Sequence, residues 1–218
     1  ALHVSGAVAD GMAWRNARVL LRCLNGAVEV AAGEDGQYEA NLFGASLPCA
    51  VRVSLADGAK LHALKLGTEK DAVLNVTPLT DFLVTRLARR DAGQFFDRFD
   101  PAQTSFTSAQ IKDATDEIKT LLGEFVDLRI LNDFVADKLR PSTVSVSSDD
   151  PYNRLLQLLK DRLDAQSRNA VLEFLTSTSP LSVVVPFPVS LITWTSRVPL
   201  MGGWSFQFSD VIAYSSRL

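Results

Sequence analysis

The hydrophobic pattern of the chain changes its period at Thr77-Pro78, and this change constrains the fold more than any other feature of the sequence. Before it, apolar and polar residues alternate, as along residues 50–55, which is typical of strands with one face in a core. After it, apolar residues recur at helical spacing, as in Leu79, Phe82 and Leu83. The sequence therefore predicts an α+β chain in which strands come first and helices follow.

Seven short β-rich runs precede the change of period. Turn dipeptides that pair a residue tolerant of positive φ with glycine separate several of them, for example Asn25-Gly26 and Asp35-Gly36. Seven short strands at a spacing of about ten residues are typical of a β-sandwich. The predicted strands span residues 4–8, 17–23, 27–31, 38–43, 50–55, 60–66 and 72–76.

Three helix starts are marked in the second part of the chain. Thr77 is a candidate N-cap with Pro78 at the first helical position, and Asp150-Pro151 repeats that arrangement. Thr107 and Gln110 form the S/T-x-x-E/Q pattern of a capping box.

The helix that follows Thr107 is expected to be long. An apolar stripe runs from Ile111 to Leu139, and Pro141 would end it. The helix that follows Asp150-Pro151 is expected to continue as far as Leu175.

The last part of the chain has a different composition. Residues 180–218 hold three charged side chains and are rich in Val, Ile, Phe, Trp and Ser. We expect strands at 183–187, 189–195, 204–208 and 211–214, which either form a small sheet on the helices or extend the sandwich. The predicted domains are therefore a sandwich at 1–76, a helical region at 77–179 and a β-rich tail at 180–218.

Aromatic side chains of this tail are the candidate ligand-binding residues. Alternation places Trp204, Phe206 and Phe208 on one strand face, and Trp194 lies on a neighbouring predicted strand. If exposed, such a face stacks on sugar rings or seats a partner. If packed against the helices, it is part of a core.

Composition and motifs indicate no catalytic, metal or cofactor site. A net charge of -3 gives no basic footprint for nucleic acid. The sequence has no dinucleotide, P-loop or nucleophile-elbow motif and no zinc-ligand spacing. His3 and His62 are the only histidines, and the alternating pattern predicts that His62 points outward from its strand. The carboxylates Asp113, Asp116 and Glu117 are interpreted as a solvated helix face.

No transmembrane helix is expected. The longest weakly charged stretch, residues 181–204, contains Arg197 and is interrupted by prolines. The chain opens at Ala1 without an initiator Met, so we expect a processed chain whose targeting signal lies upstream.

Cys23 and Cys49 are the only cysteines, and their chemistry depends on the compartment. In an oxidising compartment they can close a loop of about 26 residues, which stabilises the fold by about 3 kcal/mol. In a reducing compartment they would be two buried thiols. The cysteine count alone leaves both alternatives open.

Three motifs at the front of the chain resemble one known family. Gly6-Ala-Val8-Ala-Asp10, the alternating aliphatics of 17–21 and Asp35-Gly36-Gln37-Tyr38 are similar to the carboxypeptidase regulatory-like, or prealbumin-like, sandwich. The resemblance covers roughly the first 75 residues. It implies an extracytoplasmic, non-catalytic module, and it favours a disulfide between Cys23 and Cys49.

A second resemblance spans most of the chain. The junction Asn75-Val76-Thr77-Pro78 and the later run Asp150-Pro151-Tyr152 are similar to uncharacterised proteobacterial lipoproteins in which such a sandwich precedes helices. The tail after Pro180 departs from their pattern. The resemblance implies a periplasmic or outer-membrane-anchored protein with a lipid anchor in the precursor. Its expected partner is a protein or glycan of the cell envelope.

Three functional hypotheses follow from these patterns. The first is a non-enzymatic binding or structural module of the cell envelope. The second is a glycan-binding accessory module that uses the tail aromatics, by analogy with other sandwich domains. The third is an enzyme of unrecognised type, which would need a pocket with convergent carboxylates.

Overall fold

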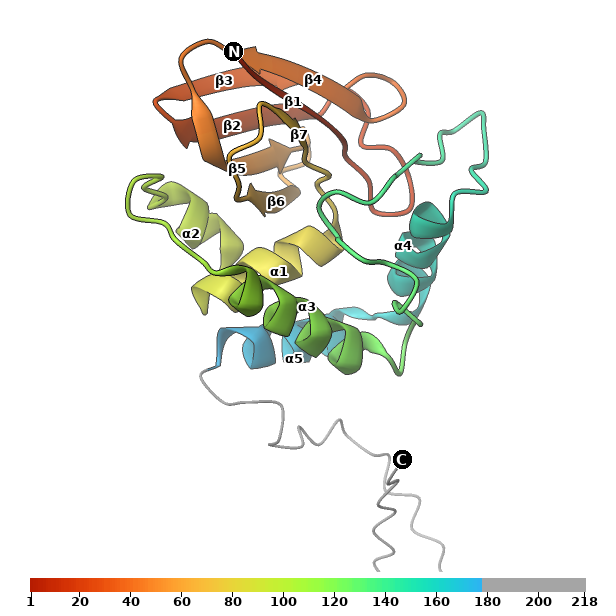
Figure 1. The fold of residues 1–218 in the computed structure, drawn as a ribbon. Helices are drawn as coiled ribbons and strands as arrows, with labels where there is room; N and C mark the ends of the chain where they lie inside the picture. The colour runs from red at the N-terminus through yellow and green to blue at the C-terminus, as the bar shows by residue number, and fades with distance from the viewer. Residues whose placement is uncertain (178–218) are drawn as a thin grey trace, which may run out of the picture. The chain divides into compact units, whose positions relative to one another are not determined.

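The computed structural model describes residues 1–177, which form a mixed α+β fold of seven strands and five helices (Figure 1). The strands are β1 (Leu2–Ala7), β2 (Arg18–Leu24), β3 (Gly26–Ala31), β4 (Gln37–Leu42), β5 (Ser46–Ser54), β6 (Lys60–Lys65) and β7 (Asp71–Val73). The helices are α1 (Pro78–Ala88), α2 (Ala92–Asp97), α3 (Ser108–Leu122), α4 (Pro151–Arg162) and α5 (Ala165–Thr176).

The strands form two sheets in a β-sandwich-like arrangement. One sheet has the order β4-β1-β7, with β1 antiparallel to β4 and parallel to β7. The other is antiparallel with the order β3-β2-β5-β6. Each of the seven predicted strands is present, with ends that differ by a few residues from the sequence-based ranges.

Two glycines of the front motifs are required by close backbone contacts. A Cβ at Gly6 would lie 2.2 Å from the carbonyl oxygen of Leu74, because the chain after β7 continues alongside β1, where the N–H of Leu74 donates to the Ser5 carbonyl over 2.8 Å. Gly36 has φ +76, and a Cβ there would lie 2.7 Å from the carbonyl oxygen of Val8. A side chain at either position would therefore push two segments of the sandwich apart.

Buried clusters lie on both faces of the sheet β3-β2-β5-β6 at its β5 and β6 strands. On the face that carries Cys23 and Cys49, Val19 pairs with Val53 and Leu21 pairs with Val51, and all of these side chains are buried. The opposite face supplies Ala50 and Leu64 to a second cluster, whose other buried members come from α1, α2 and the segment that follows α2. These members are Val84, Ala92, Phe96 and Phe99.

Helix α1 covers the free edge of this sheet at β6. The backbone N–H of His62 donates to Asp81 Oδ1 over 3.0 Å, and the His62 carbonyl accepts from Thr80 Oγ1 over 2.9 Å. An exposed edge strand is a template for aggregation, so these two bonds close it. The expectation that His62 points outward is wrong, because the residue is only 5 % exposed and its side chain lies on the face that the helices cover. The alternating pattern of β6 predicts one buried face and gives no sign that the helices bury the other face as well.

The three predicted helix starts are confirmed. Thr77 caps α1, and its partner in the capping box is Thr80 rather than an acidic or amide side chain. Thr107 and Gln110 form the predicted capping box of α3, with bonds of 3.2 and 2.8 Å. Asp150 caps α4 ahead of Pro151 by accepting from the N–H of Asn153. A short helix, α2, lies between the first two of these and has no counterpart in the predictions.

The predicted helix from Thr107 to Pro141 is wrong in its second half. Helix α3 ends at Leu122, and the next helix begins at Pro151. Three aspartates between them accept hydrogen bonds from nearby backbone N–H groups: Asp127 from Arg129, Asp133 from Val135 and Asp137 from Asn132. Such local bonds compete with helical ones. The apolar stripe is nevertheless buried, since Val135 and Leu139 pack inside without being helical.

Asn75 fastens this irregular segment to the sandwich. Its side chain is buried, accepts from the N–H of Ala7 over 3.1 Å and donates to the carbonyl of Asp137 over 2.7 Å. Its own backbone N–H donates to the carbonyl of Val135 over 2.8 Å. One amide therefore joins β1 to a segment that lies about 60 residues beyond Asn75 itself.

The predicted helix from Pro151 to Leu175 is two helices. Helix α4 ends at Arg162 and α5 begins at Ala165. Asp164 between them accepts from the N–H of Ser167 over 2.7 Å and caps α5. The break follows from this capping residue, which favours a helix start at that position. No helix among the described residues is long and apolar enough to cross a membrane.

Candidate functional site

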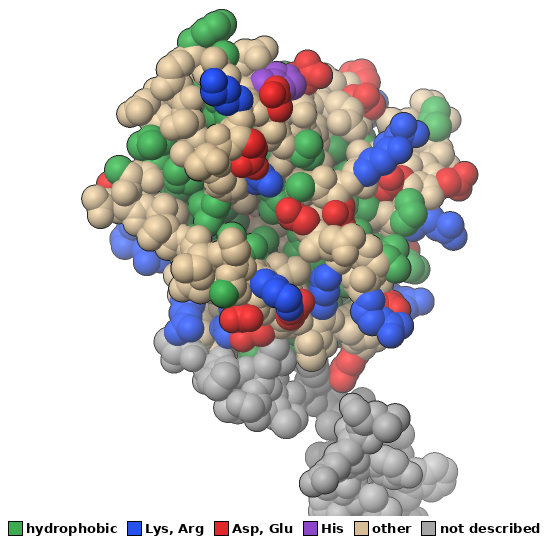
Figure 2. Space-filling view, viewed as in Figure 1, with side chains coloured by type: hydrophobic (Ala, Val, Ile, Leu, Met, Phe, Trp, Pro, Cys, Tyr) green, Lys and Arg blue, Asp and Glu red, His purple; other side chains and the backbone are tan. Residues whose placement is uncertain are grey.

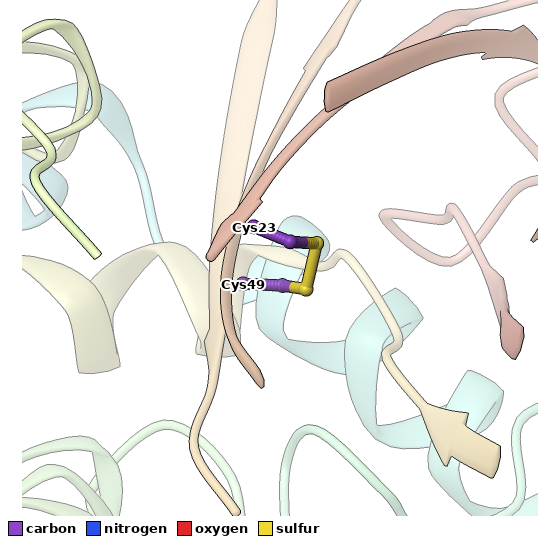
Figure 3. The surroundings of a disulfide bond; sticks show 2 residues. All are labelled: Cys23 and Cys49. Carbon is purple, nitrogen blue, oxygen red and sulfur yellow. A yellow bond between two sulfur atoms is a disulfide. The ribbon is translucent and has the colours of Figure 1, made fainter. Parts of the chain in front are cut away.

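The structure contains the disulfide between Cys23 and Cys49. The two residues are directly paired across β2 and β5, and their side chains emerge side by side from the adjacent strands (Figure 3). Both are buried, with at most 5 % of either residue exposed. The bond is therefore shielded from reductants in the folded state.

The candidate ligand-binding aromatics lie outside the described residues. Trp194, Trp204, Phe206 and Phe208 all fall in 178–218, so the hypothesis of an aromatic sugar-binding face stays a prediction. Within residues 1–177, no group of three or more His, Cys, Asp or Glu side chains is arranged to hold a metal ion. His3 lies 3.6 Å from Asp71 at the surface.

One buried polar network surrounds the ring of Phe96. The Arg52 guanidinium lies 4.3 Å from the Phe96 ring centroid and bonds to Asp97 and to the Gly93 carbonyl. On the strand next to it, His62 Nδ1 lies 2.8 Å from Asp81 Oδ1. Arg52 Nε lies 3.4 Å from His62 Nε2 and links the Arg52–Asp97 ion pair to the His62–Asp81 hydrogen bond.

Each polar group of this network is already used. With a proton on Nδ1, His62 donates to Asp81 and accepts from Arg52, so both ring nitrogens are engaged. Arg52 also lowers the pKa of the Asp97 carboxyl by donating a hydrogen bond to it. A general base needs a free nitrogen within reach of substrate. The Phe96 network is therefore a connection between the sheet and the helices.

A small hollow lies where α1, α4 and α5 meet the turn after β1. Its volume is 130 Å³. Phe82 of α1 and Leu156 and Leu159 of α4 form the apolar part of its lining, together with Pro78 and the half-buried Leu163. We call it the Phe82 hollow.

Local sequence explains how the walls of the Phe82 hollow are placed. Gly11, at φ +105, follows Asp10, and a Cβ there would lie 2.8 Å from the Cα of Gln157. Only glycine allows the turn to come this close to α4. Helix α4 is held from its other side by Tyr152, whose buried hydroxyl donates to the Phe134 carbonyl over 2.6 Å. Burial raises the pKa of the Tyr152 hydroxyl.

The charges around the Phe82 hollow do not balance. Lys160 Nζ pairs with Asp10 Oδ2 over 3.0 Å. The guanidinium of Arg168 lies 6.0 Å from the Phe82 ring centroid, and Arg168 forms no ion pair with any residue in 1–177. One positive charge is therefore left over at an apolar hollow.

Ion pairs hold several other charged side chains of residues 1–177. On the face shown in Figure 2, acidic and basic side chains lie close to one another. A larger hollow of 210 Å³ between α1 and α3 contains Arg86, whose guanidinium already bonds to Glu117 and to the Ser177 carbonyl. Glu117, expected to be a solvated carboxylate, is thus half of a partly buried ion pair.

A third hollow of 450 Å³ is lined mainly by exposed side chains, including Asp35, Lys138 and Arg140. It lacks the apolar lining that ligand sites usually have. Of these three, the Phe82 hollow combines apolar side chains with an excess of positive charge, because Lys160 and Arg168 line it with a single carboxylate, Asp10. The hollow between α1 and α3 also has an arginine without an ion pair in residues 1–177, Arg89, but two carboxylates, Asp113 and Glu117, line that hollow as well. The Phe82 hollow is the candidate site.

Sequence reasoning missed the residues of the Phe82 hollow. Leu156 and Leu159 are buried residues of α4, and helical spacing alone does not distinguish the wall of a hollow from a filled core. Asp10 and Lys160 are 150 positions apart in the sequence, so no local pattern could pair them. The one available signal was Arg168, a cation near a helix start, where the helix dipole does not favour it.

Comparison with known proteins adds no relative: no protein-family model, no curated sequence and no solved structure matches this chain. The described residues themselves define the class. It is a mixed α+β protein in which two sheets, one of them crosslinked by a buried disulfide, pack with five helices. Its candidate site is the Phe82 hollow beside the sandwich.

Proposed function

We propose that this chain is a non-enzymatic binding module of the bacterial cell envelope. The Cys23–Cys49 disulfide is the observation that carries the proposal, because disulfides of this kind form and persist in oxidising compartments. The resemblance of the front motifs to carboxypeptidase regulatory-like sandwiches supports the same compartment. The likeness to proteobacterial lipoproteins extends the proposal to a periplasmic or outer-membrane-anchored protein with a lipid anchor in its precursor.

The non-catalytic part of the proposal rests on how the polar side chains are used. His62, Asp81 and Arg52 bond to one another and to backbone groups of the sheet and helices. Their hydrogen-bonding capacity is consumed by the fold. The binding part rests on the Phe82 hollow, where Arg168 has no carboxylate partner among the described residues.

The proposal is tested by locating the protein and its thiols in cells of the source organism. Cells are fractionated after free thiols have been blocked with a maleimide, and the purified chain is then reduced and labelled with a second, heavier maleimide. We expect the chain in the envelope or periplasmic fraction, with both Cys23 and Cys49 carrying only the second label. A cytoplasmic chain that carries the first label on both cysteines would refute the proposal.

A further inference from the structure

We propose that the Phe82 hollow binds a carboxylate joined to one compact apolar group, with Arg168 holding the carboxylate. The inference rests on the proposed binding function and specifies its ligand class. The ligand is either a free small acid or the C-terminal residue of a peptide, because both present the same chemistry. The ligand class follows from the volume of the hollow, its charge and the packing of its lining.

The size of the hollow limits the apolar part of the ligand. Its volume is 130 Å³. An apolar cavity of about 150 Å³ in another protein stays dry and binds benzene. One phenyl ring, or a branched chain of similar bulk, is therefore the largest group that the Phe82 hollow accepts.

The charge of the hollow selects an anion. Asp10 does not oppose this, because its carboxylate is held by Lys160 Nζ and also accepts from the N–H of Met12 over 3.3 Å. Arg168 supplies the remaining positive charge. A guanidinium forms two parallel hydrogen bonds to a carboxylate, so a carboxylate fits this group better than a halide does.

The position of Arg168 is not explained by its own helix. Arg168 lies in the first turns of α5, where a cation gains nothing from the helix dipole. The nearest acid on that helix end, Asp164, already accepts from the N–H of Ser167, and this bond lowers the pKa of the Asp164 carboxyl. Stacking on Phe82 instead holds the guanidinium at the edge of the hollow.

The apolar lining is held in place by packing. Phe82, Leu156 and Leu159 are each at most 2 % exposed and belong to two different helices, so the half-buried Pro78 and Leu163 supply most of the apolar surface that a ligand meets. Preformed walls reduce the entropy lost on binding. Affinity is still limited by ligand size, and a dissociation constant in the millimolar range is expected for about ten heavy atoms.

The test is a titration of the ¹⁵N-labelled full chain with phenylacetate, followed by two-dimensional NMR. We expect saturable shifts of amide signals around Leu159, Leu163 and Arg168. The neutral analogue 2-phenylethanol should bind about tenfold more weakly, because it cannot replace the charge-assisted hydrogen bonds. Acetate, which lacks the apolar group, should produce no saturable shift.

Two variants connect the binding to Arg168. Arg168→Gln should weaken phenylacetate binding by about tenfold and leave 2-phenylethanol binding unchanged. Arg154→Gln is the matched control, because Arg154 is an exposed arginine of α4 that does not line the hollow. It should bind like the wild type.

Three results would overturn the inference. They are the absence of saturable shifts, equal binding of phenylacetate and 2-phenylethanol, and unchanged phenylacetate binding in Arg168→Gln. If the chain is nevertheless found in the envelope with its disulfide formed, only the ligand class fails. If the chain is cytoplasmic with free thiols, the proposed function fails whatever the titration shows.

A second titration separates the two ligand sources. The tripeptide Gly-Gly-Phe with a free C-terminus is compared with its C-terminally amidated form. Binding of the free form at least as tight as that of phenylacetate supports a peptide C-terminus. Binding of phenylacetate alone supports a free small acid, because the peptide backbone then does not fit beside the hollow.

Discussion

Phe96 and Phe82 each have an arginine over the ring, and the surroundings of the two arginines differ. Over Phe96, Arg52 is closed in by Asp97, the Gly93 carbonyl and His62. Over Phe82, Arg168 has no acidic partner in residues 1–177 and lies at a hollow. The same cation–π contact therefore completes the fold at one place and leaves a binding group available at the other.

The comparison shows which observation identifies a candidate site. Burial does not, because the most buried ionisable groups of the described chain, such as His62, are those with the fullest sets of partners. An unmatched charge beside an apolar hollow is more informative, since a protein gains no stability from it. Four predictions test whether the two regions differ in this way.

The largest expected effect comes from removing the disulfide, which joins the two strands that carry Arg22 and Arg52. The double variant Cys23→Ala/Cys49→Ala should lose about 3 kcal/mol of unfolding free energy. Amide signals around Phe96 should shift, because Arg22 next to Cys23 donates to the Phe96 carbonyl over 2.9 Å. Urea denaturation measures the loss. If the amide signals around Phe82 shift more than those around Phe96 in this variant, the disulfide does not support the Phe96 region in particular.

The second largest loss of stability is expected when the Phe96 network loses the carboxylate of Asp81. Asp81→Ala leaves the backbone N–H and Nδ1 of His62 without their acceptor in a buried position, which should cost about 2 kcal/mol of unfolding free energy. Asp113→Ala, at an exposed position on α3, is the control and should change stability by less than about 0.5 kcal/mol. Equal effects of the two changes in urea denaturation would show that the network is not structural.

The two arginines themselves give the most direct contrast. Arg52→Gln should cost about 1 kcal/mol, because the hydrogen bonds to Asp97 and the stacking on Phe96 are lost. Arg168→Gln should stay within about 0.5 kcal/mol of the wild type, since it breaks no ion pair among the described residues. Thermal denaturation of both variants checks this order. A larger loss for Arg168→Gln would mean that Arg168 serves the fold.

The smallest effect is a pH dependence that belongs to the Phe96 region alone. Arg52 lowers the pKa of Asp97 from its ordinary value of 3.8, so the stabilising contribution is present above that value and is lost as the pH falls through the lowered pKa. The stability difference between wild type and Asp97→Asn should therefore be largest near neutral pH and disappear in strong acid. If the stability difference between wild type and Asp97→Asn grows as the pH falls, the Arg52–Asp97 ion pair does not stabilise the fold.

Most secondary structure could be predicted because it depends on local chemistry. The alternation along 50–55 and the turns with Asn25-Gly26 and Asp35-Gly36 indicate strands wherever they occur. The cap residues Thr77, Thr107 and Asp150 mark helix starts for the same reason, and each caps a helix in the structure.

The wrong structural predictions have physical causes that lie outside any local sequence pattern. The apolar stripe up to Leu139 has helical spacing, but Asp133 and Asp137 bond to the backbone, and Asn75 takes the carbonyls of Val135 and Asp137. Contacts with the sandwich thus override helix propensity in this segment. The position of His62 depends on helices that come later in the chain, and the Phe82 hollow depends on three distant segments.

The amide of Asn75 has a consequence for the order in which the protein forms. Its partners Ala7 and Asp137 are separated from it by 68 and 62 positions. Ala7 is synthesised before Asn75, whereas Asp137 leaves the ribosome several seconds later at the usual rate of about 5–20 residues per second. During that interval the Asn75 amide is hydrated, and the edge at β7 lacks its cover. The arrival of residues 135–137 converts this solvated side chain into a buried one that joins two distant segments.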